Sequence, residues 1–242
     1  CGQIVAVGAG VSQARTGERV LVDPVLRPAD GSFENVGYVG LERDGGFAAF
    51  VAVPASNASL IESALTDVEL ASFPCAYGTA ENLLTRANVV QGESVLVTGA
   101  SGGVGSAVVQ LARLRGARVI AVTTRAKARD VLALGAQQTV ERSANLVPAL
   151  GRDSVDVVVD VVGGDAFTGL LDVLKRGGRY AVAGAIAGPV VLLDLRTLYL
   201  KDLSLLGCTV TTPAVFRRLV NQIQAGALRP VVRAVYPLAD IA

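Results

Sequence analysis

Apolar positions in the first third of the chain form short runs that are separated by Gly, Asp and Pro turns. This pattern predicts three strands, at residues 4–7, 19–22 and 47–53. Residues 24–46 are polar and rich in turn-forming residues, which predicts a long surface loop between two strands. Helical spacing follows at residues 67–86, and Thr66 is the predicted cap ahead of Asp67 and Glu69. The first part of the chain is therefore expected to be β-rich and to end in a helix.

After Gln91 the pattern changes to short apolar strands that alternate with helical segments. The predicted strands are residues 95–98, 118–122, 139–140, 155–159, 180–183 and 203–209, and the predicted helices are residues 103–115, 126–134, 146–150, 167–174 and 213–226. The run that contains Val155, Val157, Val158 and Val159 is apolar on both faces, as in strands that helices cover on both sides. This alternation predicts an α/β fold with a doubly wound parallel sheet of the Rossmann type. The last residues are expected to lead towards another strand.

A glycine-rich turn joins the first strand of this alternation to its first helix. Residues that lack Cβ let a pyrophosphate approach the backbone, where N–H groups and the positive end of a helix dipole bind its oxygens. Glycines also serve tight turns that bind nothing, but the strand before and the helix after favour a dinucleotide. The predicted cofactor-binding residues of the turn are Gly99, Ser101, Gly102, Gly103, Val104 and Gly105.

The end of the next predicted strand indicates which dinucleotide binds. An NAD site would place Asp or Glu there, on the ribose 2′-hydroxyl. This chain has Thr123, Thr124, Arg125 and Lys127 instead. Hydroxyls and cations suit a 2′-phosphate, and this stretch contains no carboxylate to repel it. NADP(H) is therefore predicted over NAD(H), although the same residues would also fit a solvated helix start.

Composition limits the classes of partner that the chain is expected to bind. The chain carries 22 Lys and Arg against 21 Asp and Glu, so no global field would draw it to nucleic acid or anionic lipid. Its longest nearly apolar run, residues 181–193, is broken by Gly and Pro and is too short to span a bilayer. The three cysteines are widely spaced, which favours reduced thiols and a cytoplasmic location. We therefore expect a small-molecule substrate and neither nucleic acid nor membrane as partner.

Several motifs carry a resemblance that covers nearly the whole chain. They are Gly2-Gln3-Ile4-Val5-Ala6-Val7-Gly8, Gly17-Glu18-Arg19-Val20, Gly45-Gly46-Phe47-Ala48, Thr79 with the helix after it, the glycine turn, Asp160-Val161-Val162-Gly163 and Gly177-Gly178-Arg179. In this order and spacing the chain resembles the medium-chain dehydrogenase/reductase superfamily. That family includes zinc alcohol dehydrogenases and zinc-free quinone reductases of the zeta-crystallin type.

The resemblance implies a domain organisation. Residues 1–75 would be a partial GroES-like, β-rich catalytic domain, residues 76–210 a Rossmann NADP-binding domain, and residues 211–242 a return to the catalytic domain. It also implies more chain before Cys1 and after Ala242, since family members extend beyond both positions.

The same resemblance implies roles for the site residues. Ser101, Gly103 and Val104 would face the pyrophosphate, and the residues from Thr123 to Lys127 the adenosine phosphate. The remaining cofactor-binding positions would be Thr79, with Val161, Val162 and Gly163 over the adenosine, and Gly184, Ala185, Ile186, Gly207 and Cys208 by the nicotinamide. A homodimer would form by edge-to-edge pairing near residues 203–209, where an apolar edge strand needs cover.

The presence of zinc is left open by the sequence. Cys75, four residues before Thr79, falls where the zinc-binding branch of the family places its last catalytic cysteine, although a small buried residue would fit there as well. Residues 24–46 contain no cysteine, so the four-cysteine structural zinc lobe is absent from them. The chain also contains no histidine, the commonest zinc ligand and general base.

These features favour an NADPH-dependent oxidoreductase that transfers a hydride to a small enone, quinone or aldehyde. A conjugated acceptor needs less electrophilic help than an isolated carbonyl, for which a zinc ion acts as Lewis acid. The alternatives are a zinc-dependent alcohol dehydrogenase with Cys75 as a ligand and a non-catalytic NADP(H)-binding sensor or structural protein. Asp153, Asp156 and Asp160 are expected to be solvated or structural rather than an acid/base pair.

Overall fold

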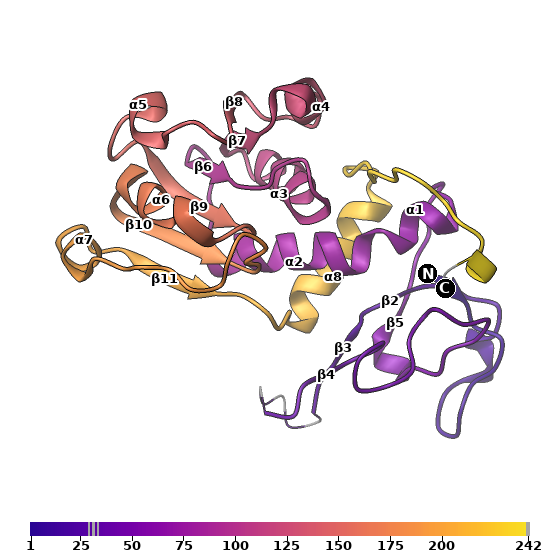
Figure 1. The fold of residues 1–242 in the computed structure, drawn as a ribbon. Coiled ribbons are helices and arrows are strands. Elements are labelled where there is room, and N and C mark those ends of the chain that lie inside the picture. Colours follow the sequence, from indigo (N-terminus) through magenta and orange to yellow (C-terminus); the bar gives the residue numbers. More distant parts are fainter. Residues whose placement is uncertain (29, 31, 33, 241–242) are drawn as a thin grey trace. The chain divides into compact units, whose positions relative to one another are not determined.

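The computed structural model describes residues 1–28, 30, 32 and 34–240, and its chain divides into two units (Figure 1). Unit 1 combines both ends of the chain, Cys1–Gly78 and Val210–Ala242, and unit 2 is Thr79–Thr209. No helix in the described part of the chain has the length and apolar character that a membrane crossing requires.

Unit 2 is built on a six-stranded parallel sheet with the order β11-β10-β9-β6-β7-β8. Its strands are β6 (Ser94–Val97), β7 (Arg118–Thr123), β8 (Gln138–Glu141), β9 (Val155–Asp160), β10 (Leu174–Val182) and β11 (Ser204–Gly207). The central strands are buried almost throughout, because helices cover both faces and apolar side chains point both ways. The predicted doubly wound Rossmann sheet is therefore confirmed.

Helices follow the strands of unit 2 in alternation. They are α3 (Gly103–Leu114), α4 (Ala128–Ala133), α5 (Leu146–Leu150), α6 (Phe167–Val173) and α7 (Leu195–Leu200), with 3-10 turns η3 (Arg125–Lys127) and η4 (Gly164–Ala166). Residues of α5 and α6 pack with Leu96, Val158 and Tyr180 into one hydrophobic cluster. α3 contacts β6 and β7, and every one of its residues from Gly105 to Ala112 is buried. α7 was not predicted, since it is short and most of its apolar side chains are exposed.

Unit 1 holds two small sheets. β1 (Gly2–Gln3), β2 (Arg19–Val22) and β5 (Ala58–Leu60) pair antiparallel, and β3 (Val25–Leu26) pairs with β4 (Gly37–Tyr38). Its helices are α1 (Asp67–Ala71), α8 (Pro213–Gln224) and the start of α2 (Phe73–Arg86), with 3-10 turns η1 (Gln13–Arg15), η2 (Ala55–Asn57) and η5 (Leu238–Asp240).

Several predictions for unit 1 are wrong. A strand was expected at residues 4–7, but β1 covers only Gly2–Gln3, just before them. Residues 47–53 form no strand either, and Phe47 is 83% exposed. An apolar run becomes a strand only where another strand pairs with its backbone groups, and the described residues offer 47–53 no such partner. The loop expected at 24–46 contains β3 and β4, although its residues 29, 31 and 33 lie outside the described part. The described residues after α8 form no strand.

The helix expected at residues 67–86 begins as predicted but is broken. Thr66 accepts a hydrogen bond from the Glu69 N–H, and the Glu69 carboxylate accepts one from the Thr66 N–H. This capping box satisfies two backbone donors of the first turn. The break at Ser72 has a local cause, because Pro74 has no N–H to continue the helical hydrogen bonds. α1 and α2 therefore form two helices where the pattern predicted one.

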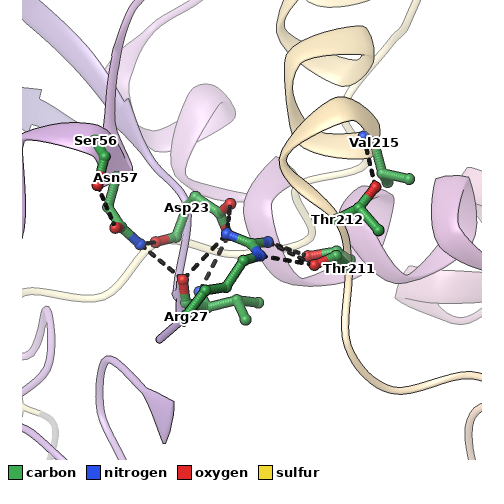
Figure 2. Close-up of polar contacts among 8 residues, drawn as sticks. Asp23, Arg27, Ser56, Asn57, Thr211, Thr212 and Val215 are labelled. Atoms are coloured by element: carbon green, nitrogen blue, oxygen red, sulfur yellow. Dashed lines mark hydrogen bonds and ion pairs between the residues drawn. The ribbon is translucent and has the colours of Figure 1, made fainter. Parts of the chain in front are cut away.

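A polar cluster joins the two chain segments of unit 1 (Figure 2). The Arg27 guanidinium donates to the buried Asp23 carboxylate at 2.7 Å and to the Thr211 carbonyl at 2.7 and 2.9 Å. Asn57, also buried, donates to the carbonyls of Asp23 and Val25. A buried carboxylate that lacked these partners would be costly, so the cluster fixes the chain where it returns from unit 2.

Candidate functional site

The carboxyl ends of the six parallel strands meet at one edge of the sheet in unit 2. The strand order reverses between β6 and β9, which pair directly through Val97 and Val159. The connections that leave β6 and β9 run in opposite directions, and ligands of open α/β sheets bind at such a switch point. The glycine turn follows β6, so the structure places the predicted motif at the expected location.

The glycine turn is packed too tightly for larger residues. Gly99 has a φ of +55°, which favours glycine, and a Cβ there would lie 3.1 Å from side-chain atoms of Val161 and Val162. A Cβ on Gly105 would lie 2.2 Å from the Gly99 carbonyl oxygen. The start of α3 therefore lies so close to the glycine turn that a residue with a side chain would not fit at Gly105.

The start of α3 is suited to an anion. Its cap is Gly102, which is exposed and has no side chain to bind the first N–H groups of the helix. Gly103 is exposed as well, and Ser101 and Val104 are partly buried beside it. Free N–H groups and the positive end of a twelve-residue helix fit the pyrophosphate that the sequence predicts.

A buried carboxylate orders the end of β9. The Asp160 side chain has no exposed surface and accepts hydrogen bonds from the hydroxyls of Thr98 and Tyr180, each at 2.5 Å. It also accepts from the backbone N–H groups of Val162 and Gly163. Burial and this hydrogen bond raise the pKa of Tyr180 well above its usual value. Asp160 is thus structural, one of the two roles expected for it, and it fixes the loop that follows β9.

The loops after β9 and β10 lie against each other. The Ala187 N–H donates to the Val162 carbonyl at 2.8 Å, and a Cβ on Gly184 would lie 2.9 Å from the Val161 carbonyl oxygen. A Cβ on Gly163 would lie 3.2 Å from the Ala185 Cα. The structure therefore brings together the residues predicted on the adenosine and nicotinamide sides.

At the end of β7 the four predicted phosphate-binding residues lie on a strand end and the 3-10 turn η3. The Thr123 side chain is buried, and its hydroxyl oxygen has no hydrogen-bond partner in the structure. Thr124 is half-buried, whereas Arg125 and Lys127 are exposed. An unpartnered buried hydroxyl beside two cations fits a polar ligand at this position.

One interpretation of this segment needs correction. The sequence from Thr123 to Lys127 contains no carboxylate, but the structure places one beside it. Glu141 pairs with Thr123 in the parallel register of β7 and β8, and its Oε2 accepts a hydrogen bond from the Arg125 N–H at 2.7 Å. The site is therefore not free of negative charge.

The remaining predicted residues are less informative. Ile186 is 88% exposed, and Gly207 has open space where a Cβ would stand. Cys208 is buried and its N–H donates to the Val182 carbonyl; burial raises the pKa of its thiol. Thr79 is half-buried on α2. The positions of these residues at a cofactor stay predictions.

Cys75 is a free, exposed thiol on α2. Across the described residues, no group of three or more His, Cys, Asp and Glu side chains lies together in a way that could hold a metal. The structure thus gives Cys75 no partner ligands, and its role as a zinc ligand stays a prediction.

Comparison with known proteins identifies the family. The model of the alcohol dehydrogenase GroES-like domain matches residues 1–63, and that of the zinc-binding dehydrogenase matches residues 103–225. An acryloyl-coenzyme A reductase from Metallosphaera sedula is 32% identical over 254 residues, which cover 99% of this chain and 75% of the relative. The chain belongs to the medium-chain dehydrogenase/reductase superfamily. The resemblance seen in the sequence is confirmed, and the protein is an oxidoreductase of this superfamily.

Other members of the superfamily span a range of named activities. A quinone oxidoreductase from Sus scrofa is 30% identical and covers all of this chain and 71% of its own length. Among solved structures, a protein from Sinorhizobium meliloti 1021 that is provisionally assigned as an alcohol dehydrogenase is 52% identical, with a TM-score of 0.94 over 99% of this chain and 68% of its own.

Two further solved structures contain bound groups. The cobalt- and zinc-bound alcohol dehydrogenase from Pyrobaculum aerophilum is 34% identical, with a TM-score of 0.88 over 99% of this chain and 74% of its own. The 2-octenoyl-CoA carboxylase reductase CinF, in complex with NADP and 2-octenoyl-CoA, is 27% identical, with a TM-score of 0.90 over 99% and 62%.

Sequence reasoning missed Glu141 and the partners of Asp160 in this oxidoreductase. Both carboxylates end a strand of the parallel sheet, and such strand ends converge at one edge. The position of a carboxylate at a strand end can be read from the sequence, but the neighbouring strand that its side chain contacts cannot.

Replacing Tyr180 tests the Asp160 network. Tyr180→Phe keeps the ring edge-on to Phe167 but removes the hydroxyl that Asp160 accepts. Hydrogen bonds to charged groups contribute about 1.5–3 kcal/mol, so the free energy of unfolding should fall by about 2 kcal/mol at pH 8. The raised pKa of Tyr180 means that its contribution is complete below about pH 10 and declines as the pH rises further, so at pH 11 the difference should shrink by about 1.4 kcal/mol.

Urea unfolding at the two pH values measures both effects. Tyr199→Phe is the matched control, because that ring is exposed on α7, and it should change the stability by less than about 0.5 kcal/mol. A Tyr180→Phe protein as stable as the wild type at pH 8 would contradict the structural role of Asp160.

Proposed function

We propose that this oxidoreductase binds NADP(H) and transfers a hydride to a small enone, quinone or aldehyde. The observation that carries the cofactor assignment is the end of β7, where exposed Arg125 and Lys127 lie beside the buried, unpartnered hydroxyl of Thr123. Cations and a hydroxyl suit the 2′-phosphate that distinguishes NADP(H) from NAD(H).

Different residues of the chain would bind different parts of the cofactor. Gly99 and Gly102 to Gly105 let the pyrophosphate approach the start of α3, with Ser101 beside it. The Asp160 network holds Val161, Val162 and Gly163 in place for the adenosine, and Gly184 and Ala185 lie next to them for the nicotinamide. The bound dinucleotide would supply or accept the hydride, while the protein orients it.

The acceptor class is proposed from chemistry and from the names of relatives. Acryloyl-coenzyme A is a conjugated thioester, and quinones are conjugated as well. Reduction of such acceptors spreads the developing negative charge, so it needs less electrophilic help than reduction of an isolated carbonyl. This supports a reaction that the chain could perform without histidine.

A zinc-dependent alcohol dehydrogenase is the second candidate. It is supported by the exposed thiol of Cys75 and by the relative from Pyrobaculum aerophilum that was solved with cobalt and zinc. A zinc ion would act there as the Lewis acid for an isolated carbonyl.

One experiment separates these functions. The natural full-length protein is purified, its zinc content is measured, and NADPH oxidation is followed with a panel of enones, quinones and aldehydes. We expect turnover of at least one conjugated acceptor at a rate that does not depend on zinc. Zinc bound in stoichiometric amount, together with oxidation of simple alcohols, would instead favour the second candidate. Nucleotide binding without turnover on any acceptor would leave a non-catalytic binding protein.

The cofactor preference is tested by removing the two cations. Arg125→Ala with Lys127→Ala should weaken NADPH binding by at least tenfold and change NADH binding by less than threefold, because only NADPH carries the 2′-phosphate. The binding constants are read from the fluorescence of the reduced nucleotides. Arg152→Ala with Arg176→Ala removes the same charge from exposed positions elsewhere in unit 2 and should leave both constants unchanged. Equal losses for the two nucleotides would show that the phosphate site is misplaced.

We also propose that the protein is a homodimer joined along β11. This strand is an outer strand of the sheet, and Leu205 on it is exposed. The preceding segment exposes further apolar side chains, Val190, Leu192, Leu195 and Tyr199. An exposed apolar edge strand invites pairing with another strand, so a second copy is a physically reasonable partner.

Light scattering at micromolar concentration should give the mass of two chains. Leu205→Lys places a charge on the strand edge and should shift the protein towards the monomer, because charged edges oppose pairing. Leu114→Lys, at an exposed apolar position at the end of α3, is the control and should remain dimeric. A monomeric wild type would refute the proposal.

A further inference from the structure

Glu141 lies where the two nicotinamide dinucleotides would differ. It is the last residue of β8, and the parallel register sets it opposite Thr123, the last residue of β7. The Arg142 N–H donates to the Thr123 carbonyl at 3.0 Å, which ties the two strand ends together. The Glu141 carboxylate is therefore held at the end of β7 by the sheet itself.

The carboxylate already binds one of the groups that a phosphate would use. Its Oε2 accepts from the Arg125 N–H at 2.7 Å, at the first residue of η3. Thr124 is the cap of this turn but makes no side-chain hydrogen bond to it. Glu141 thus does from the neighbouring strand what a capping side chain normally does locally. The Arg125 N–H, which a bound phosphate would use, is therefore already bound to a carboxylate of the protein itself.

We propose that Glu141 sets the cofactor selectivity of this protein by opposing the 2′-phosphate and accepting a 2′-hydroxyl. This inference rests on the proposed function, because both place the adenosine ribose at the end of β7. Arg125 and Lys127 favour NADP(H), and Glu141 reduces that preference. The protein would then use NAD(H) as well. The difference in affinity between the two cofactors would be smaller than the two cations alone would produce.

The opposition has a simple electrostatic basis. A 2′-phosphate beside Arg125 would have to share the Arg125 N–H with a carboxylate of the same sign or displace that carboxylate into solvent. A 2′-hydroxyl is neutral and can donate a hydrogen bond to the same oxygen, which is the contact that an acidic residue makes in NAD sites. One side chain therefore weakens one cofactor and strengthens the other. Because Glu141 is exposed, added salt should reduce its effect on the phosphate.

A purely structural cap is the competing explanation, and Glu141→Gln distinguishes the two. The glutamine amide oxygen can still accept from the Arg125 N–H, so the cap is preserved while the charge is removed. Glu141→Ala removes both the charge and the cap. If Glu141 only capped η3, the glutamine variant would behave as the wild type and the alanine variant alone would differ.

The experiment measures binding of NADPH and NADH by their fluorescence, and of adenosine 2′,5′-bisphosphate and adenosine 5′-monophosphate by calorimetry. Glu141→Gln should tighten NADPH and the bisphosphate by about tenfold at low salt and weaken NADH by about threefold, so the ratio of the two dissociation constants changes by more than tenfold. Most of the gain for NADPH should disappear in 0.5 M salt. Thermal unfolding should show that the variant is folded.

Asp130→Asn is the matched control. It removes the same charge from an exposed position on the first turn of α4, in the same segment of chain, and should change the ratio by less than twofold. A ratio that stays within twofold of the wild type in Glu141→Gln overturns the inference, whether or not Glu141→Ala differs. That outcome is distinct from failure of the proposed function, in which the wild type would bind neither nucleotide and both proposals would be overturned.

Discussion

The hydrogen bonds of Asp160 join three strands at the point where the sheet changes direction. Thr98 follows β6, Asp160 ends β9, and Tyr180 belongs to β10, so one carboxylate connects the two halves of the sheet across the switch point. Fully buried charge is tolerated only where its oxygens are satisfied, and here hydroxyl and backbone donors satisfy them. The glycine turn and the two loops that pack against each other all start from strands that this carboxylate holds. The geometry of the candidate site therefore depends on a residue that is not among the predicted cofactor-binding positions.

The sequence predicted the sheet of unit 2 far better than the small sheets of unit 1. Strands such as β9 are buried on both faces and consist mostly of apolar residues, and the glycine turn marks the start of α3. The two- and three-residue strands of unit 1 owe their existence to a neighbour rather than to their own residues. β3 and β4 arise inside a polar stretch, whereas the apolar run around Phe47 forms none. Local pattern is a poor guide where pairing decides the outcome.

Much of the candidate site could also be predicted, because a glycine turn between a strand and a helix is a local signal. The glycines have steric reasons that extend beyond the motif, such as the approach of Gly105 to the Gly99 carbonyl. Glu141 could not be found in the same way. It lies sixteen positions from Arg125 in the sequence, and only the register of β7 and β8 brings the two together. The charge around a strand end in a parallel sheet therefore also depends on the neighbouring strand, and the sequence of one strand does not predict it.

The pairing of β7 with β8 has a consequence for how such a site can change. β8 is short and follows α4 through a brief connection, and its position along β7 decides which of its side chains lies at the β7 end. A slip of two residues would keep the same face of β8 towards the core and would set Thr139 opposite Thr123 in place of Glu141. A hydroxyl would then replace a carboxylate beside η3 with no substitution at either position. Insertions and deletions in a remote surface connection can thus alter the charge of a binding site as effectively as point mutations within it.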